Sequence, residues 1–127
     1  MQKPTIFVTR RWPKETEEEM KKFFEVTINQ DDRPLTQSEI ADGFESHDAL
    51  APTVSDIIDQ NIIKKGSGKI IANYGVGFSH IDLEACKENN VTVTNTPDVL
   101  TDATADLTIL LMLMISRRAI ELSLIHI

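Results

Sequence analysis

The sequence predicts an α/β fold: a flavodoxin-like, five-stranded parallel sheet followed by a long helix. Short apolar runs alternate along the chain with segments of helical periodicity, a pattern typical of βαβ units and a parallel sheet. The last helical segment is apolar on nearly every side, whereas a helix on the surface of a small domain shows a polar face. We therefore expect this helix to lead towards a further domain.

The first two strands are expected at residues 5–8 and 25–28. Between them Pro13 opens a helix as its first residue, where the missing N–H costs nothing. Helical spacing directs Met20, Phe23 and Phe24 towards the core. Opposite charges four residues apart are expected to pair on the solvent face, namely Glu17 with Lys21 and Glu18 with Lys22.

Capping signals and apolar runs place the remaining elements. A short helix begins near Thr36, with Glu39 three residues later as a capping-box signal. Strands are expected at residues 47–50, 69–72 and 91–93, and helices at 54–61 and 81–88. The long helix starts near Thr101, which can cap it, and runs to about Arg118, whose charge suits the negative helix end.

Composition excludes several classes of partner. Thirteen basic and twenty acidic residues give a net charge of -7, which argues against nucleic acid or an anionic membrane. Cys86 is the only cysteine, so we expect no disulfide framework, no thiolate metal site and a reducing, cytoplasmic location. The longest apolar run, Leu107 to Ile115, is shorter than the ~20 residues that a membrane span needs.

The loop after the fourth strand is the most informative, because ligands of doubly wound sheets lie beyond the carboxyl ends of the strands. Gly75 and Gly77 flank Val76, so backbone amides there can approach a ligand closely. A helix follows, with Ser79 as its expected cap, and amides beside a helix N-terminus favour an anion such as a carboxylate. Alternatively, the two glycines only make a tight strand-to-helix turn.

Other nucleotide and phosphate motifs fail on specific residues. A dinucleotide loop would need glycine at His80 and an acidic residue at Asn95. The Gly66–Lys69 segment precedes a strand, so it predicts a turn and not a phosphate-binding loop. A receiver domain would need acidic residues after the first strand, an aspartate after the third and a lysine after the fifth, and none is present. The loop at residues 11–13 also lacks the glycines and hydroxyls of a flavin phosphate site.

An ordered series of motifs gives a more specific signal. Residues 73–86, NYGVGFSHIDLEAC, are followed by VTVTNTP at 91–97, LTDATAD at 100–106 and SRR at 116–118. This series resembles the D-isomer-specific 2-hydroxyacid dehydrogenases, and it is most similar to the glyoxylate/hydroxypyruvate reductase branch, as is the VTRRWP segment at 8–13. The resemblance covers residues 4 to about 121.

The resemblance implies an oxidoreductase that transfers hydride between NADH or NADPH and a small 2-ketoacid, with glyoxylate or hydroxypyruvate as expected substrates. It places the substrate carboxylate on the loop Gly75, Val76 and Gly77, Leu50 near the substrate, and Thr104 close to the cofactor. The family's catalytic arginine, glutamate and histidine belong to motifs beyond residue 127, so we assign no catalytic residue here. His47, His80 and His126 are not substitutes. The full-length protein is expected to be a homodimer.

The resemblance also divides the chain. Residues 1–99 are expected to form the substrate-binding domain, and residues 100–121 the helix that leads to a missing Rossmann domain. The last six residues, Leu122 to Ile127, match nothing in the family pattern and are interpreted as a non-native tail. The fragment alone is expected to be inactive. The alternative is a free-standing, non-catalytic carboxylate-binding domain, which predicts a polar patch on the last helix.

Overall fold

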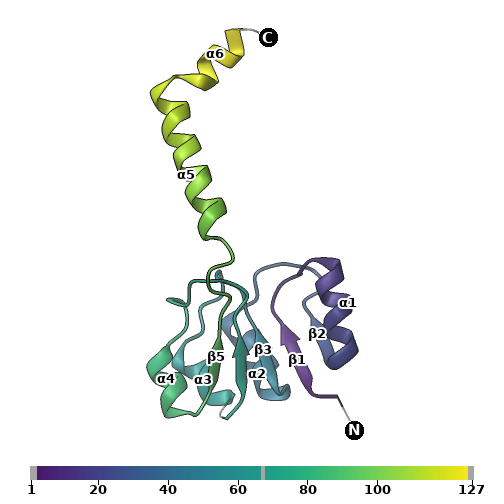
Figure 1. Ribbon diagram of the computed structural model, residues 1–127. Helices are drawn as coiled ribbons and strands as arrows, with labels where there is room; N and C mark the ends of the chain where they lie inside the picture. The colour runs from purple at the N-terminus through teal and green to yellow at the C-terminus, as the bar shows by residue number, and fades with distance from the viewer. Residues whose placement is uncertain (1–2, 67, 126–127) are drawn as a thin grey trace. The chain divides into compact units, whose positions relative to one another are not determined.

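A computed structural model describes residues 3–66 and 68–125. Its first unit holds a five-stranded, all-parallel sheet in the order β2-β1-β3-β4-β5 (Figure 1), which confirms the flavodoxin-like fold class. The strands are β1 (Thr5–Val8), β2 (Glu25–Ile28), β3 (Ala49–Ala51), β4 (Ile70–Ala72) and β5 (Thr92–Thr94). The helices are α1 (Lys14–Phe23), α2 (Gln37–Ser46), α3 (Gln60–Lys65), α4 (Leu83–Glu88), α5 (Thr101–Ser116) and α6 (Ala119–Ile125).

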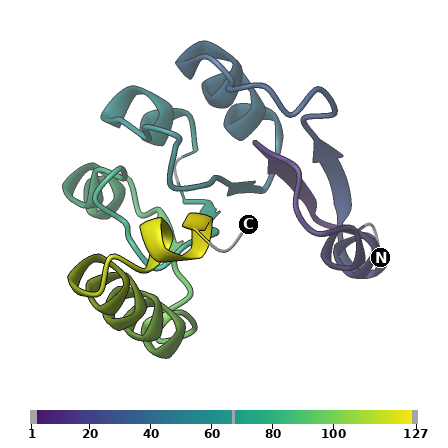
Figure 2. The same ribbon diagram turned by 90° about the horizontal axis from the view of Figure 1, so that it is seen from above.

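Apolar side chains cover both faces of the sheet. The larger core packs α2, α3 and α4 against one face, around Phe44, Leu50 and Ile71, all fully buried. The smaller core packs α1 against the other face, where Val8 and Ala51 are also fully buried. Figure 2 shows α1 on one side of the strands and α2 and α3 on the other. This two-sided burial explains why β3 and β4 are continuous apolar runs, whereas the edge strands β2 and β5 keep exposed polar residues, namely Glu25, Thr27, Thr92 and Thr94.

The expected capping box of α2 is confirmed. The Thr36 hydroxyl accepts from the Glu39 amide at 3.3 Å, and the Glu39 carboxylate accepts from the Thr36 amide at 2.8 Å. The predicted start of α3 at residue 54 is wrong, because Asp59 caps this helix by accepting from the amides of Asn61 and Ile62. The residues before Asp59 form a loop and isolated bridges instead.

Several other boundaries differ from prediction. Helix α4 is capped by Asp82, which accepts from the Ala85 amide, and not by Ser79. Thr101 is the first residue of α5 and not its cap, and no side chain in the described chain caps this helix. Strand β3 begins at Ala49, because His47 caps the end of α2 and the side chains of His47 and Asp48 bond to Thr27 and Thr5 of the neighbouring strands. Strand β5 runs one residue later than predicted.

The solvent face of α1 was predicted only in part. Met20 and Phe24 pack on the smaller core, but Phe23 is 62% exposed. Glu17 is buried and pairs with Arg11, which precedes the helix, and not with Lys21. The other predicted pair is also replaced, since Glu18 pairs with Lys14 and Lys22 with Glu19. Pro13 occupies the N-cap, one position before the first helical residue.

The second unit spans residues 97–127 and contains α5 and α6. Every residue of α5 is exposed or partly exposed within this unit, including the large side chains Leu110, Met112 and Ile115. Helix α5 ends at Ser116, two residues earlier than predicted, because Arg118 adopts a left-handed conformation with φ 51°. No helix among the described residues is both long and apolar enough to cross a bilayer. Residues 126–127 of the predicted non-native tail lie outside the described residues. So does Ser67 of the turn predicted at residues 66–69.

Candidate functional site

Four loops meet at the carboxyl edge of the sheet, as expected for parallel strands. Backbone hydrogen bonds tie each loop to its neighbour: Thr9 N donates to Ala51 O at 3.2 Å, and Tyr74 N donates to Pro52 O at 2.9 Å. On the other side Asn73 N donates to the carbonyl of Thr94, and Thr96 N to that of Gly75. The loop that carries Gly75, Val76 and Gly77 is therefore fixed between the ends of β3 and β5.

The side chain of Asn73 organises this loop from beneath. It is 3% exposed, and its Nδ2 donates to Gly75 O at 3.1 Å and to Gly77 O at 2.9 Å. Its Oδ1 lies 3.0 Å from His80 Nε2, which places His80 in the turn before α4 as a half-buried hydrogen-bond partner. Burial lowers the pKa of His80, although the charge of Asp56 opposes this effect. We did not single out Asn73 from the sequence, yet a polar residue directly after the apolar run of β4 is a usable signal.

The amides of Val76 and Gly77 donate to no acceptor in the described part of the chain. Val76 and Gly77 are both exposed. Unpaired N–H groups at the mouth of a sheet are competent to bind an anion. The loop therefore offers two adjacent donors whose neighbouring carbonyls are already used.

The two glycines of the loop have different surroundings. A Cβ on Gly75 would lie 2.5 Å from Val54 Cγ1, closer than real Cβ contacts allow. A Cβ on Gly77 would meet no described atom within 4 Å, and Gly77 does not have a positive φ. Glycine at 75 is thus explained by packing. Nothing in the described chain requires glycine at 77, and the space beside its Cα is open.

The other predicted site residues lie elsewhere. Leu50 is fully buried in the larger core, so its side chain does not reach the mouth of the sheet; Pro52 and Thr53 occupy that position after β3. Thr104 is in the first turns of α5, within the second unit, where its carbonyl accepts from the Thr108 hydroxyl. Contact of Leu50 with substrate and of Thr104 with cofactor remain predictions.

The arginines after β1 are held by acidic partners. Arg11 donates to both carboxylate oxygens of Glu17 at 2.8 Å, and these bonds hold the pKa of Glu17 below its usual range. The Arg11 amide and the Arg10 guanidinium both donate to Asp32, which lowers the pKa of that carboxyl. Both cations are therefore bonded to carboxylates of the protein, Arg11 through two guanidinium nitrogens and Arg10 through Nε.

Sequence reasoning also missed a buried carboxylate between the loops. Asp56 is 5% exposed, and its Oδ2 accepts from the Thr9 hydroxyl at 2.5 Å and from the Thr53 amide at 2.8 Å. It connects the end of β1 to the loop after β3. Trp12 and Tyr74 form a second connection across the same edge, with ring centroids 4.6 Å apart.

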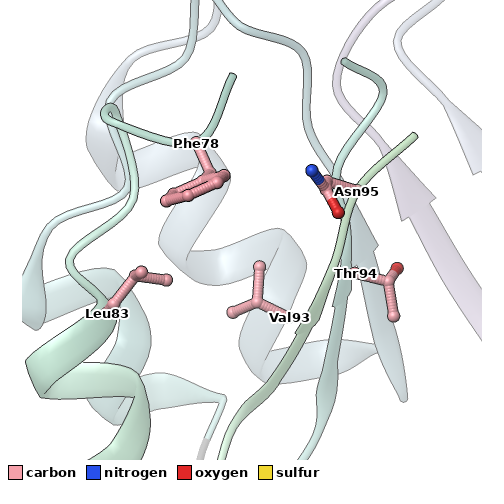
Figure 3. A pocket seen from close by; sticks show the side chains of 5 residues that line it. All are labelled: Phe78, Leu83, Val93, Thr94 and Asn95. Carbon is pink, nitrogen blue, oxygen red and sulfur yellow. The ribbon is translucent and has the colours of Figure 1, made fainter. Parts of the chain in front are cut away.

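An apolar hollow of about 180 Å³ lies beside the loop, between β5 and the start of α4. It is lined by Phe78, Leu83, Val93, Thr94 and Asn95. Figure 3 shows Phe78 and Leu83 facing Val93 across it. Asn95 connects the hollow to the loop, because its Nδ2 donates to Val76 O at 2.9 Å. The hollow does not include Gly75–Gly77, so the two free amides form a separate feature.

Comparison with known families decides the assignment. Residues 6–122 match the D-isomer specific 2-hydroxyacid dehydrogenase family, in its catalytic domain. The chain belongs to this family. Among curated members, the glyoxylate reductase of Thermococcus litoralis is 38% identical over 120 residues, which are 94% of this chain and 36% of that protein. The chain thus spans little more than a third of such 2-hydroxyacid dehydrogenases.

Comparison with solved structures supports the same assignment. The TT0316 protein of Thermus thermophilus is 39% identical, with a TM-score of 0.78 over 92% of this chain and 38% of its own. An NADPH-dependent glyoxylate/hydroxypyruvate reductase of Sinorhizobium meliloti, solved with NADP and malonate, is 25% identical, with a TM-score of 0.67 over 89% of this chain and 34% of its own. The recognition made from the motif series is confirmed at the level of the family.

Proposed function

We propose that the chain is the substrate side of a 2-hydroxyacid dehydrogenase and that Val76 and Gly77 bind the carboxylate of a small 2-ketoacid. One observation carries this proposal: two adjacent amides lack acceptors at the carboxyl edge of the sheet, beside a glycine that internal packing does not explain. A carboxylate can accept from both amides at once, and charge-assisted bonds of this kind are stronger than neutral ones. Glyoxylate and hydroxypyruvate are the proposed substrates, as in the names of the relatives.

The redox step needs groups that the described residues do not provide. The residues after β4 and β5 do not fit a dinucleotide site, because His80 stands where its third glycine would be and Asn95 where its acidic residue would be. We propose that NAD or NADP binds mainly to sequence outside residues 1–127, with Thr104 on its near side. The catalytic arginine, glutamate and histidine would come from the same sequence. We also propose that the full-length enzyme is a cytoplasmic homodimer.

Binding of oxalate tests the site directly, because oxalate is an unreactive two-carbon carboxylate. We expect oxalate to shift the Val76 and Gly77 amide resonances of the ¹⁵N-labelled chain. The Gly68 amide, which already donates to Asn89 O at 2.9 Å, should not move. A titration with chloride at equal ionic strength controls for screening. The proposed carboxylate site is wrong if Val76 and Gly77 do not respond, or if all loop amides respond equally.

A non-catalytic carboxylate-binding domain would pass the same titration. The reading frame beyond the codon for Glu121 separates the two candidates. The dehydrogenase proposal requires a G-x-G-x-x-G loop and then an arginine, a glutamate and a histidine in that order. An intact frame without them would leave only the binding domain. The apolar surface of α5 already favours the dehydrogenase, since a free-standing domain would place polar residues there.

A further inference from the structure

The orientation of the peptide groups in the loop 75–77 can be traced to particular side chains. The described peptide bonds are all trans, so the C=O of one residue and the N–H of the next point in opposite directions. Asn73 Nδ2 draws the carbonyls of Gly75 and Gly77 towards itself, at 3.1 and 2.9 Å. The Val76 amide must therefore point away from Asn73, towards the open side of the loop.

The side chain of Asn73 can do this in only one orientation. Its Nδ2 has two hydrogens and both are used by the two loop carbonyls, whereas Oδ1 accepts from His80 Nε2 at 3.0 Å. A flipped amide would set Oδ1 against two carbonyl oxygens and an NH₂ group against the ring N–H. His80 is itself held in place, because its backbone carbonyl accepts from the Ile58 amide at 2.9 Å.

The surroundings of Asn73 make the arrangement stiff. The residue is 3% exposed, and its backbone N–H and C=O are bonded to Thr94 O and to Gly75 N, respectively. All of its polar groups are satisfied inside the protein, so water does not compete with the loop carbonyls for Nδ2. An amide direction fixed before binding lowers the ordering cost that a ligand would otherwise have to meet.

We propose that Asn73 and His80 are positioning residues for the carboxylate site: Asn73 turns the loop carbonyls inward so that the Val76 amide faces the ligand, and His80 fixes the orientation of the Asn73 amide. This inference rests on the proposed function of the Val76 and Gly77 amides. Neither side chain touches the ligand. Both the neutral Nε2–H tautomer and the charged ring of His80 donate to Oδ1, so the positioning does not depend on pH.

The chain offers a matched control for Asn73. Asn29 Nδ2 also donates to two backbone carbonyls, those of Thr9 at 2.9 Å and Arg33 at 2.7 Å, but in the loop after β2. We expect Asn73→Ala to weaken oxalate binding at least tenfold, roughly the effect of one lost charge-assisted hydrogen bond, and Asn29→Ala to change it by less than about twofold. Both variants should lose stability, which thermal unfolding measures separately.

The donor requirement is tested at His80. His80→Gln retains an N–H that reaches Asn73 Oδ1, and His80→Leu removes it, so oxalate affinity should be near wild type in the first variant and about threefold lower in the second. This pair carries the test if Asn73→Ala does not fold. Equal affinities for the two His80 variants, or equal losses in Asn73→Ala and Asn29→Ala, would overturn the inference. If the wild-type chain itself does not bind oxalate through Val76 and Gly77, the proposed function fails as well.

Discussion

Substitution of Gly77 by alanine should separate ligand binding from folding. The added Cβ meets no described atom within 4 Å, and the backbone is outside the left-handed region that requires glycine. Loss of glycine then reduces only the entropy of the unfolded chain, so Gly77→Ala should stabilise the protein by about 0.4–1 kcal/mol and raise Tm by roughly 2–8 °C. Because the methyl group occupies the space from which a carboxylate would approach, oxalate affinity should fall about tenfold, a change of ~1.4 kcal/mol.

The matched substitution at Gly75 should behave in the opposite way. Its Cβ would lie 2.5 Å from Val54 Cγ1, and because Val54 is 58% exposed and can turn aside, the cost should be at the low end of overpacking, about 1 kcal/mol. Val54→Ala combined with Gly75→Ala should recover that loss. Thermal unfolding and oxalate titration of the variants give both quantities. The reasoning is refuted if Gly77→Ala unfolds at a lower temperature than wild type, or if it binds oxalate unchanged.

Three further outcomes are expected. Glu17→Ala should lower the free energy of unfolding by about 2 kcal/mol in urea titrations, because the Trp12 amide and a half-exposed Arg11 lose their acceptor. Glu18→Ala, at an exposed position, should have little effect. Equal losses in the two variants would contradict this prediction. The bonds from Arg33, together with those from the amide and hydroxyl of Thr36, lower the pKa of Glu39 from 4.5 to about 2. Their stabilisation is therefore present above pH 4.5 and is lost as the pH falls towards 2. Glu39→Gln should flatten this part of the stability profile, and an unchanged slope would refute the assignment. Residues 1–127 with glyoxylate should not oxidise NADH or NADPH in an absorbance assay, and any turnover would show that the missing catalytic residues are not needed.

The central strands were predictable because each is mostly a run of apolar residues, a pattern that burial on both faces imposes on the sequence. The capping box at Thr36 and Glu39 was predictable for a similar reason, since it depends only on residues three positions apart. Both signals are local. The strands and the capping box form as predicted, apart from shifts at the strand ends, because no tertiary contact replaces them.

The predicted helix at residues 54–61 failed where a tertiary contact did compete. Val54, Ile57 and Ile58 have helical spacing, but only Ile58 is buried, and the other two are 58% and 63% exposed. Asp56 holds this segment in a turn by accepting from the Thr53 amide and the distant Thr9 hydroxyl. Periodicity cannot reveal a bond between residues 47 positions apart.

Glu17 failed for a related reason. The spacing of Glu17 and Lys21 is that of a surface ion pair, but such pairs contribute little, typically 0–1 kcal/mol. Two bonds from Arg11 and one from the Trp12 amide outweigh it and draw the carboxylate inward, where it fixes the chain between β1 and α1. Both partners are visible in the sequence, but the path of the chain before the helix, which brings them to Glu17, is not.

The glycines of the NYGVG segment show why local sequence left two interpretations open. A tight turn and an anion site both need glycine, and a sequence does not distinguish the reasons. The structure distinguishes the two positions: a side chain at Gly75 would require Val54 to move, whereas Gly77 has room that no described residue fills. Packing therefore bears on the first glycine only. The proposed carboxylate ligand would use that open space, and the Gly77→Ala variant tests this proposal without disturbing the packing at Gly75.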